Sequence, residues 1–315
     1  MKNLLSALFP PRPVFPPARR RCDLVIVSAV SDGEWLGVED LLDSLATYLD
    51  CDYEVVFADD ATTDGTYERL LDAGCWVVRN PEKMFLRGLN LTLRRAFVEA
   101  LRLFDAPVYL KIDPDALVIG HGLPGALKAA FDAAPSIGLL GTYQFDWDGE
   151  QRDLSHWKNR MTRRRKDFGR AIDIAEKNGY RIGDGVQGGA YALSAACLRR
   201  IEGDGWLHGR HGYAPSTVQG WQVAEDSLIT MLTYASGYRA ADFGGPGQPF
   251  GIWDVGLPMP PEALVEQNRL VTHAMKYRDA ASLAARDFFR ARRDACRPAG
   301  GGTLRRSTPD PEGQP

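Results

Sequence analysis

The chain has 315 residues, of which 44% are hydrophobic and 25% are charged, and these values are ordinary for a globular protein with a sizeable core. Its formal net charge of −3 gives no electrostatic reason to expect a nucleic-acid partner. The five cysteines are scattered, odd in number and free of metal-ligand spacing, which suits a reducing compartment. We therefore expect a cytoplasmic protein.

The two ends of the chain are expected to lie outside the folded domain. Residues 1–21 hold no apolar run long enough for a signal peptide or an integral membrane span, and we predict a flexible lead-in. Residues 297–315 hold too little apolar sequence to order themselves, which predicts a disordered tail. Residues 22–296 are predicted to form one α/β domain.

Strands and helices alternate along the first part of this domain. A continuous apolar run is typical of a strand buried on both faces of a sheet, and apolar residues at helical spacing indicate the helices between such runs. The alternation predicts a Rossmann-like, mostly parallel central sheet with helices on both faces. The predicted strands are Leu24–Val30, Tyr53–Ala58, Cys75–Val78 and Val108–Ile112, and the predicted helices run from Val38 to Leu49, from an N-cap at Asp64 to Leu71, and from Leu89 to Phe104.

Aspartates follow two of the predicted strands. Asp59 and Asp60 come after the second strand, and Asp113 and Asp115 follow the fourth, where Pro114 favours the end of the strand. The carboxyl ends of parallel strands meet at one edge of the sheet, where ligands bind in open α/β folds. Closely spaced carboxylates repel each other, and hard oxygen ligands prefer Mg²⁺ or Mn²⁺. A solvated turn is the simpler alternative for the Asp-Pro-Asp segment.

Motifs of other nucleotide-binding and hydrolytic folds are missing from the sequence. A dinucleotide-binding fold would show Gly-x-Gly-x-x-Gly after the first strand, but Ser28–Glu34 contains a single glycine. The Walker phosphate loop and the nucleophile elbow are also absent.

The later part of the domain continues the pattern with a fifth strand at Ile137–Tyr143. Lys158–Arg170 contains seven lysines or arginines against one aspartate, and a solvated connection or helix is favoured there over a flap that reaches an anionic ligand. A helix at Val223–Tyr234 carries two acidic residues in its first turn, where charge complementation of the helix dipole is the simple explanation. The closing helix, Leu283–Ala295, offers Leu283, Phe288 and Phe289 for packing.

The segment from Asp59 to Thr66, Asp-Asp-Ala-Thr-Thr-Asp-Gly-Thr, resembles the signature of inverting glycosyltransferases of the GT-A fold, family 2 type. The resemblance covers Leu24 to about Tyr234 and departs from the family pattern at Ala29–Asp32. It implies that Asp59, within the pair Asp59-Asp60, contacts the base of a nucleotide-sugar. It also implies that Asp113 contacts the ribose or sugar and shares the metal, and that Asp115 binds the cation.

The same resemblance assigns roles in the second half of the chain. Gly188 and Gly189, which precede a strand, would line the donor sugar and the acceptor site. Asp226 would be the general base that takes the acceptor proton, and Glu225 would orient the acceptor. His273 stands where many GT-A enzymes supply a last metal ligand, although a lone histidine is more often at the surface or in the core.

The resemblance therefore implies a transferase that uses Mn²⁺ or Mg²⁺ and moves one hexosyl or N-acetylhexosaminyl unit with inversion. The expected donor is a nucleoside-diphosphate sugar, first of all a UDP-sugar, and the acceptor is a saccharide or another hydroxyl compound. Residues 22–120 would form the nucleotide-binding half and residues 121–296 the acceptor half. A sugar-1-phosphate nucleotidyltransferase is one alternative, although its phosphate loop is missing, and a catalytically silent nucleotide-sugar-binding module is another.

Overall fold

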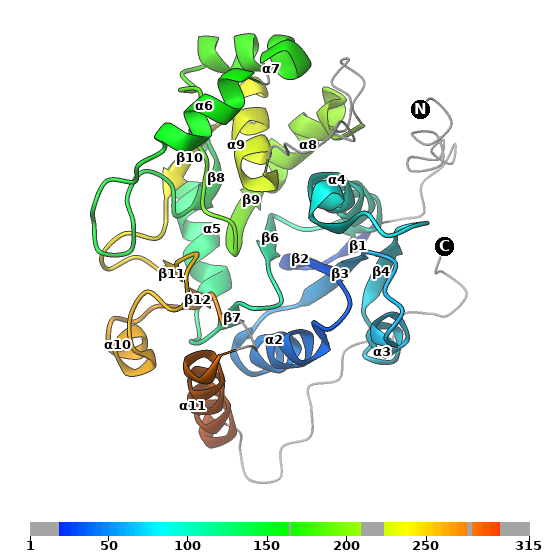
Figure 1. Cartoon of the computed structure of the whole chain (residues 1–315), viewed down its shortest axis with the longest axis vertical. Coiled ribbons are helices and arrows are strands. Elements are labelled where there is room, and N and C mark those ends of the chain that lie inside the picture. The colour runs from blue at the N-terminus through cyan, green and yellow to red at the C-terminus, as the bar shows by residue number, and fades with distance from the viewer. Residues whose placement is uncertain (1–18, 164, 209–223, 276–278, 297–315) are drawn as a thin grey trace.

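The structure, a computed structural model, describes residues 19–163, 165–208, 224–275 and 279–296. Its centre is a seven-stranded sheet with the order β10-β8-β9-β6-β2-β3-β4 (Figure 1). Strand β9 runs antiparallel to both neighbours and the other paired strands run parallel, so the sheet is mostly parallel, as predicted. The strands are β2 (Leu24–Val30), β3 (Tyr53–Asp59), β4 (Trp76–Arg79), β6 (Val108–Ile112), β8 (Ile137–Gly141), β9 (Ala190–Ser194) and β10 (Arg239–Asp242).

Strands β2 and β6 lie in the middle of the sheet, and nearly all of their side chains are consequently buried. Their bounds agree with the prediction, whereas the fifth predicted strand ends at Gly141 and not at Tyr143. In the parallel register Val30 pairs with Asp59, so the carboxyl ends of β2 and β3 lie level. The loops that follow these strands and β6 consequently gather at one edge of the sheet.

Helices cover both faces of the sheet, as predicted (Figure 1). The first face carries α4 (Phe85–Leu103), α7 (Arg165–Lys177), α8 (Ala195–Gly203) and α9 (Glu225–Ala235). The second carries α2 (Trp35–Tyr48) and α5 (Leu123–Ala133). The remaining described helices are α3 (Thr66–Asp72), α6 (Ser155–Arg163), α10 (Pro261–Glu266), α11 (Ala280–Cys296) and the short 3-10 helix η1 (Trp206–His208).

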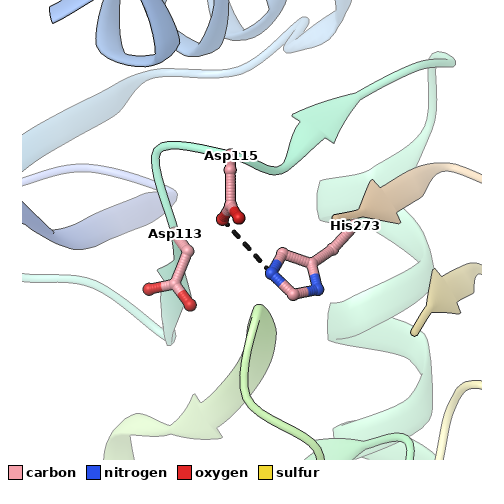
Figure 2. Close-up of side chains that lie close together, drawn as sticks. All are labelled: Asp113, Asp115 and His273. Atoms are coloured by element: carbon pink, nitrogen blue, oxygen red, sulfur yellow. Dashed lines mark ion pairs between the residues drawn. The ribbon is translucent and has the colours of Figure 1, made fainter. Parts of the chain in front are cut away.

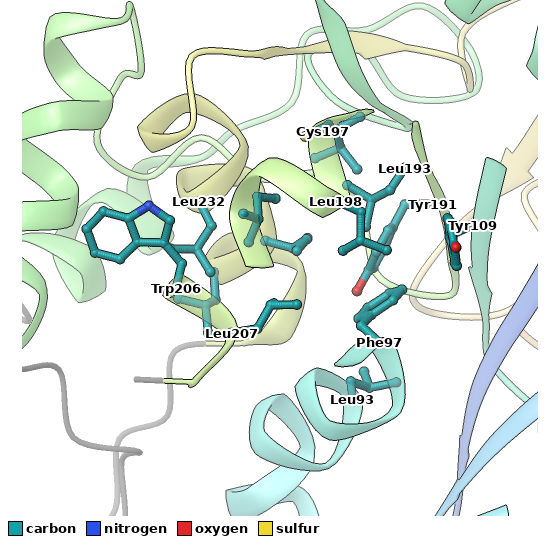
Figure 3. Packing of buried hydrophobic residues seen from close by; sticks show 14 of the residues in the cluster. Leu93, Phe97, Tyr109, Tyr191, Leu193, Cys197, Leu198, Trp206, Leu207 and Leu232 are labelled. Atoms are coloured by element: carbon teal, nitrogen blue, oxygen red, sulfur yellow. The ribbon is translucent and has the colours of Figure 1, made fainter. Parts of the chain in front are cut away.

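Figure 3 shows the packing on the first face. Phe97 of α4 lies beside Tyr191 of β9, while Leu198 of α8 and Leu232 of α9 belong to the same buried cluster. All four side chains are nearly inaccessible to solvent. This core fixes α9, whose first turn carries two of the predicted site residues, relative to β9 and β6.

A second, three-stranded sheet brings the C-terminal part of the chain to the edge where β6 ends. It consists of β7 (Leu117–Val118), β12 (Val271–His273) and β11 (Phe250–Ile252). Strand β12 runs antiparallel to β7, and Val271 pairs with Val118. Because β7 directly follows the Asp-Pro-Asp segment, this pairing places His273 beside it. A two-stranded pair, β1 (Arg20–Arg21) with β5 (Phe104–Asp105), completes the sheets of the described residues.

Two local predictions need correction. The N-cap of α3 is Gly65, with φ of 86°, and not Asp64. Asp64 instead accepts hydrogen bonds from the backbone N–H of Thr66 (3.1 Å) and of Gly33 (2.7 Å), so it joins the loops after β3 and β2. In α11, Leu283 is 46% exposed, because another face of the helix, which includes the buried Phe289, packs against the domain.

The basic stretch Lys158–Arg170 belongs to α6 and α7 over its described residues. The stretch is thus helical, but it is not wholly solvated as predicted, because Met161 and Phe168 are buried in the core. No helix among the described residues is long and apolar enough to cross a membrane. The predicted lead-in and tail lie almost wholly outside the described residues.

Candidate active site

Asp113 is fixed to the glycine pair that precedes β9. Its backbone N–H donates to the carbonyl of Gly189 (2.7 Å), and its carboxylate accepts the N–H of Gly189 (3.0 Å). Gly189 has a φ of +73°, and a Cβ at this position would lie 2.6 Å from the imidazole of His273. Only glycine therefore allows this close approach of the backbone to both side chains.

Asp115 and His273 face each other across the same site (Figure 2). Nε2 of His273 lies 3.2 Å from a carboxylate oxygen of Asp115, and Nδ1 lies 2.9 Å from the carbonyl oxygen of Trp253. A hydrogen bond from Nδ1 to this carbonyl leaves Nε2 directed at Asp115. Burial lowers the pKa of His273, but the adjacent Asp115 and Asp113 outweigh that effect and raise it.

The three side chains fit a divalent cation. One ligand atom from each of Asp113, Asp115 and His273 can be chosen so that all lie within 4.8 Å of one another. Within the part of the chain that the structure describes, this is the one such group of three or more potential ligands. Carboxylate oxygens are the ligands that Mn²⁺ and Mg²⁺ prefer, and the group contains no thiolate, the ligand that softer metals prefer.

Lys111 connects this group to α9 and was not predicted as a site residue. Its ammonium is fully buried and lies 2.7 Å from Asp113 and 3.2 Å from Glu225, above the ring of Tyr191. Burial opposes the charge, but the two carboxylates outweigh it and raise the pKa of Lys111. The available signal was a single lysine inside an otherwise apolar strand, since a buried charge needs a partner of opposite sign.

Glu225 and Asp226 form the first turn of α9 close to the glycine pair. A Cβ on Gly188 would lie 3.5 Å from a carboxylate oxygen of Asp226 and 3.7 Å from one of Glu225. Removal from water, together with the negative charge of Glu225, raises the pKa of Asp226 to about 7. Asp226 is thus ionised in a substantial fraction of molecules near neutral pH, which a general base requires.

Asp59 and Asp60 form a separate polar group at the ends of β3 and β4. Asp59 is fully buried, lies 3.3 Å from Arg79 and accepts the N–H of Thr62, and burial raises its pKa. Asp60 accepts hydrogen bonds from the side chain of Asn80 (2.9 Å) and from a backbone N–H. Both carboxylates thus contact other groups of the protein. The contact of Asp59 with a nucleobase stays a prediction.

Glu34 is a further acidic residue at this edge that sequence reasoning did not single out. It lies in the loop after β2, where its carboxylate accepts the N–H of Ser31 (2.7 Å). It is within electrostatic range of Asp113, Asp115 and Asp60.

The structure brings most of the predicted site residues together at this edge of the sheet. They are Asp113, Asp115, His273, Gly188, Gly189, Glu225 and Asp226, and Asp59 and Asp60 lie beside them at the end of β3.

Residues 25–182, half of the chain, match the sequence model of the family described as Glycosyl transferase family 2. The chain belongs to this family. The match confirms the resemblance drawn from Asp59–Thr66, and the mixed α/β architecture confirms the predicted fold class. No curated protein matches the sequence of this family 2 chain.

Several solved structures are similar in part to this family 2 chain. The mannosyltransferase PcManGT from Pyrobaculum calidifontis, in complex with GDP-Man and Mn²⁺, is 19% identical over 76% of this chain and 60% of its own, with a TM-score of 0.42. TarS 1–349 from S. aureus is 17% identical over 70% and 58%, with a TM-score of 0.44. Glucosyl-3-phosphoglycerate synthase from Mycobacterium tuberculosis is 18% identical over 71% and 70%, with a TM-score of 0.38. The chain thus spans about three fifths of the first two structures.

Proposed function

We propose that this family 2 chain is a metal-dependent inverting glycosyltransferase that moves one sugar from a nucleoside-diphosphate sugar to an acceptor hydroxyl. The observation that carries the proposal is the convergence of two groups on the glycine pair. Asp113 and His273 contact or closely approach Gly189, and Asp226 approaches Gly188. A candidate metal group and a candidate base from different elements therefore lie against two neighbouring glycines.

Asp113, Asp115 and His273 would hold Mn²⁺ or Mg²⁺. The cation, when bound, supplies positive charge that neutralises the departing nucleoside diphosphate. Contacts within the protein hold the candidate ligands in place. Lys111 and the N–H of Gly189 orient Asp113, and the carbonyl of Trp253 orients His273. Such supporting contacts fix ligand geometry before substrate arrives.

Asp226 would take the proton of the acceptor hydroxyl. The acceptor oxygen forms a bond to the anomeric carbon while the bond from that carbon to the diphosphate oxygen breaks, and the proton passes to the carboxylate of Asp226. Attack from the face opposite the leaving group inverts the anomeric centre. Lys111 lies 3.2 Å from Glu225 and fixes the position of its side chain, which suits Glu225 to orient the acceptor.

The finer assignments belong to the same proposal. We propose a UDP-sugar as the donor, with Asp59 near its base, and a saccharide or another hydroxyl compound as the acceptor. Residues 22–120 would mainly bind the nucleotide, and residues 121–296 would mainly bind the acceptor. His273 is an exception, because it belongs to the second half but would bind the metal together with Asp113 and Asp115 of the first half. The cysteine content supports a cytoplasmic location.

A ligand-dependent thermal unfolding assay tests the proposal. A ligand at about 100 times its Kd stabilises the folded state by about 2.7 kcal/mol, so the correct donor should raise Tm by several degrees. We expect this rise with a UDP-sugar in Mn²⁺ and its loss in EDTA, with GDP-sugars and nucleoside monophosphates as comparisons. If no nucleoside-diphosphate sugar raises Tm, or if EDTA leaves the rise unchanged, the proposal is wrong.

Donor hydrolysis separates the alternatives. A sugar-1-phosphate nucleotidyltransferase would instead consume a nucleoside triphosphate with a sugar phosphate, and family 2 membership disfavours it. A silent binding module would show the rise in Tm but would release no nucleoside diphosphate from the donor.

A further inference from the structure

Helix α11 is attached to α2 through a buried cluster of charges centred on Asp40. This carboxylate is only 3% exposed and lies 2.9 Å from Arg286, 2.8 Å from Arg290 and 2.9 Å from Arg293. Arg286 and Arg293 are themselves almost completely buried. Burying ions costs free energy that apolar side chains would not incur, so what the cluster adds over a simple apolar contact is a fixed geometry.

Arg286 makes a second contact that leads from α2 toward the candidate metal group. Its Nε and Nη2 donate to the carbonyl oxygen of Met275, at 3.2 and 2.5 Å. The N–H of Met275 donates in turn to the carbonyl oxygen of Asp115 (2.8 Å). A continuous chain of hydrogen bonds therefore runs from Asp40 through Arg286 and Met275 to the backbone of Asp115.

Met275 follows His273 by two residues, so this chain fixes the segment that carries the imidazole. Figure 2 shows that His273 on β12 points at Asp115 across the site. The ring of His273 contacts the Trp253 carbonyl, whereas Arg286 contacts the carbonyl of Met275, two residues further along the same segment.

We propose that Arg286 is a positioning residue for the metal centre, which it serves by holding the His273–Met275 segment against the backbone of Asp115. This inference rests on the proposed metal site. Helix α11 has other anchors, because Ala285 and Phe289 are buried in an apolar cluster with Leu117 and Leu264. Loss of the Arg286 contact should therefore loosen the segment without detaching the helix.

Arg293 supplies a matched control on the same helix. It is equally buried and pairs with the same Asp40, and its Nε lies 2.7 Å from Asp43 of α2. Arg286→Gln and Arg293→Gln both remove a buried guanidinium and should lower Tm by similar amounts. The two variants differ in that the Arg286 replacement removes the bonds to Met275, whereas the Arg293 replacement removes contacts with Asp40 and Asp43.

The test measures Mn²⁺ binding to the full chain by loss of the free-ion EPR signal, at a temperature where each variant is folded. Arg286→Gln should weaken Mn²⁺ binding on the order of tenfold, as outer contacts of metal ligands do. Arg293→Gln should stay within about twofold of the wild type, because the side chain of Arg293 contacts Asp40 and Asp43 of α2. Arg286→Lys, which can reach Asp40 or Met275 but cannot repeat the forked contact, should fall between them.

The outcomes separate this inference from the proposed function. If the wild type binds no Mn²⁺ and shows no metal-dependent donor effect on Tm, the metal site and this inference both fail. If the wild type binds Mn²⁺ and the two glutamine variants bind it equally, whether tightly or weakly, Arg286 has no positioning role and the proposed function stands. Should Arg286→Gln not fold, the same comparison of Arg286→Lys with Arg293→Lys decides.

Discussion

Asp226→Asn should lower sugar transfer by about 10²–10⁴, the usual contribution of a positioned general base. Asparagine keeps the shape of the side chain but lacks a basic oxygen that can take the acceptor proton. Donor binding should survive, because the candidate metal group lies on other elements, the turn after β6 and strand β12. Steady-state transfer rates and donor affinity, measured on the same preparations, check both parts.

The pH profile gives the Asp226 prediction a second, independent part. The pKa of Asp226 is raised to about 7, and a base must be ionised to act, so the wild-type rate should rise as pH increases through about 7. This acid limb should be absent from the residual activity of Asp226→Asn. Glu225→Gln is the matched neighbour and should raise acceptor KM more than it lowers kcat. An Asp226→Asn enzyme with near-normal kcat would refute the assignment.

Asp115→Ala should abolish metal-dependent donor binding while the protein remains folded. The substitution removes the carboxylate that faces His273. It also relieves the repulsion between Asp115 and Asp113, and the loss of this repulsion should not destabilise the metal-free protein. Calorimetry should give the same weak donor affinity in Mn²⁺ as in EDTA. Asp132→Ala, which removes an exposed carboxylate of α5, controls for the change in net charge. Unchanged, Mn²⁺-dependent donor affinity in Asp115→Ala would show that the metal assignment is wrong.

The sheet was predictable because its central strands carry their signal locally. Strands β2 and β6 are apolar runs buried on both faces, and their observed bounds equal the predicted ones. The shared edge of the aspartates followed from the parallel order alone. Asp113 and Asp115 do lie at that edge, in the turn after β6.

The rest of the site depends on pairings between distant segments, which no local pattern encodes. His273 lies beside Asp115 because β12 pairs with β7, and a three-residue strand leaves a weak signal in the sequence. Lys111 is easily seen as the one charged residue of its strand, but the sequence does not show that its partner is Glu225, 114 residues further along the chain. In α11 Leu283 was expected to pack but is half exposed, whereas arginines of this helix contact Asp40 of α2, and that contact depends on tertiary packing.

The stereochemistry of the first-formed product tests the central claim most directly. With a UDP-α-sugar as donor, proton NMR reports the anomeric configuration of the glycoside formed by transfer. When water is the acceptor, the spectra are taken in the first minutes, before the released free sugar mutarotates. A base on the acceptor side, at Asp226, predicts a β-configured product that forms only with Mn²⁺ or Mg²⁺ present. An α-configured first product, or equal formation in EDTA, would contradict metal-dependent inverting transfer at this site.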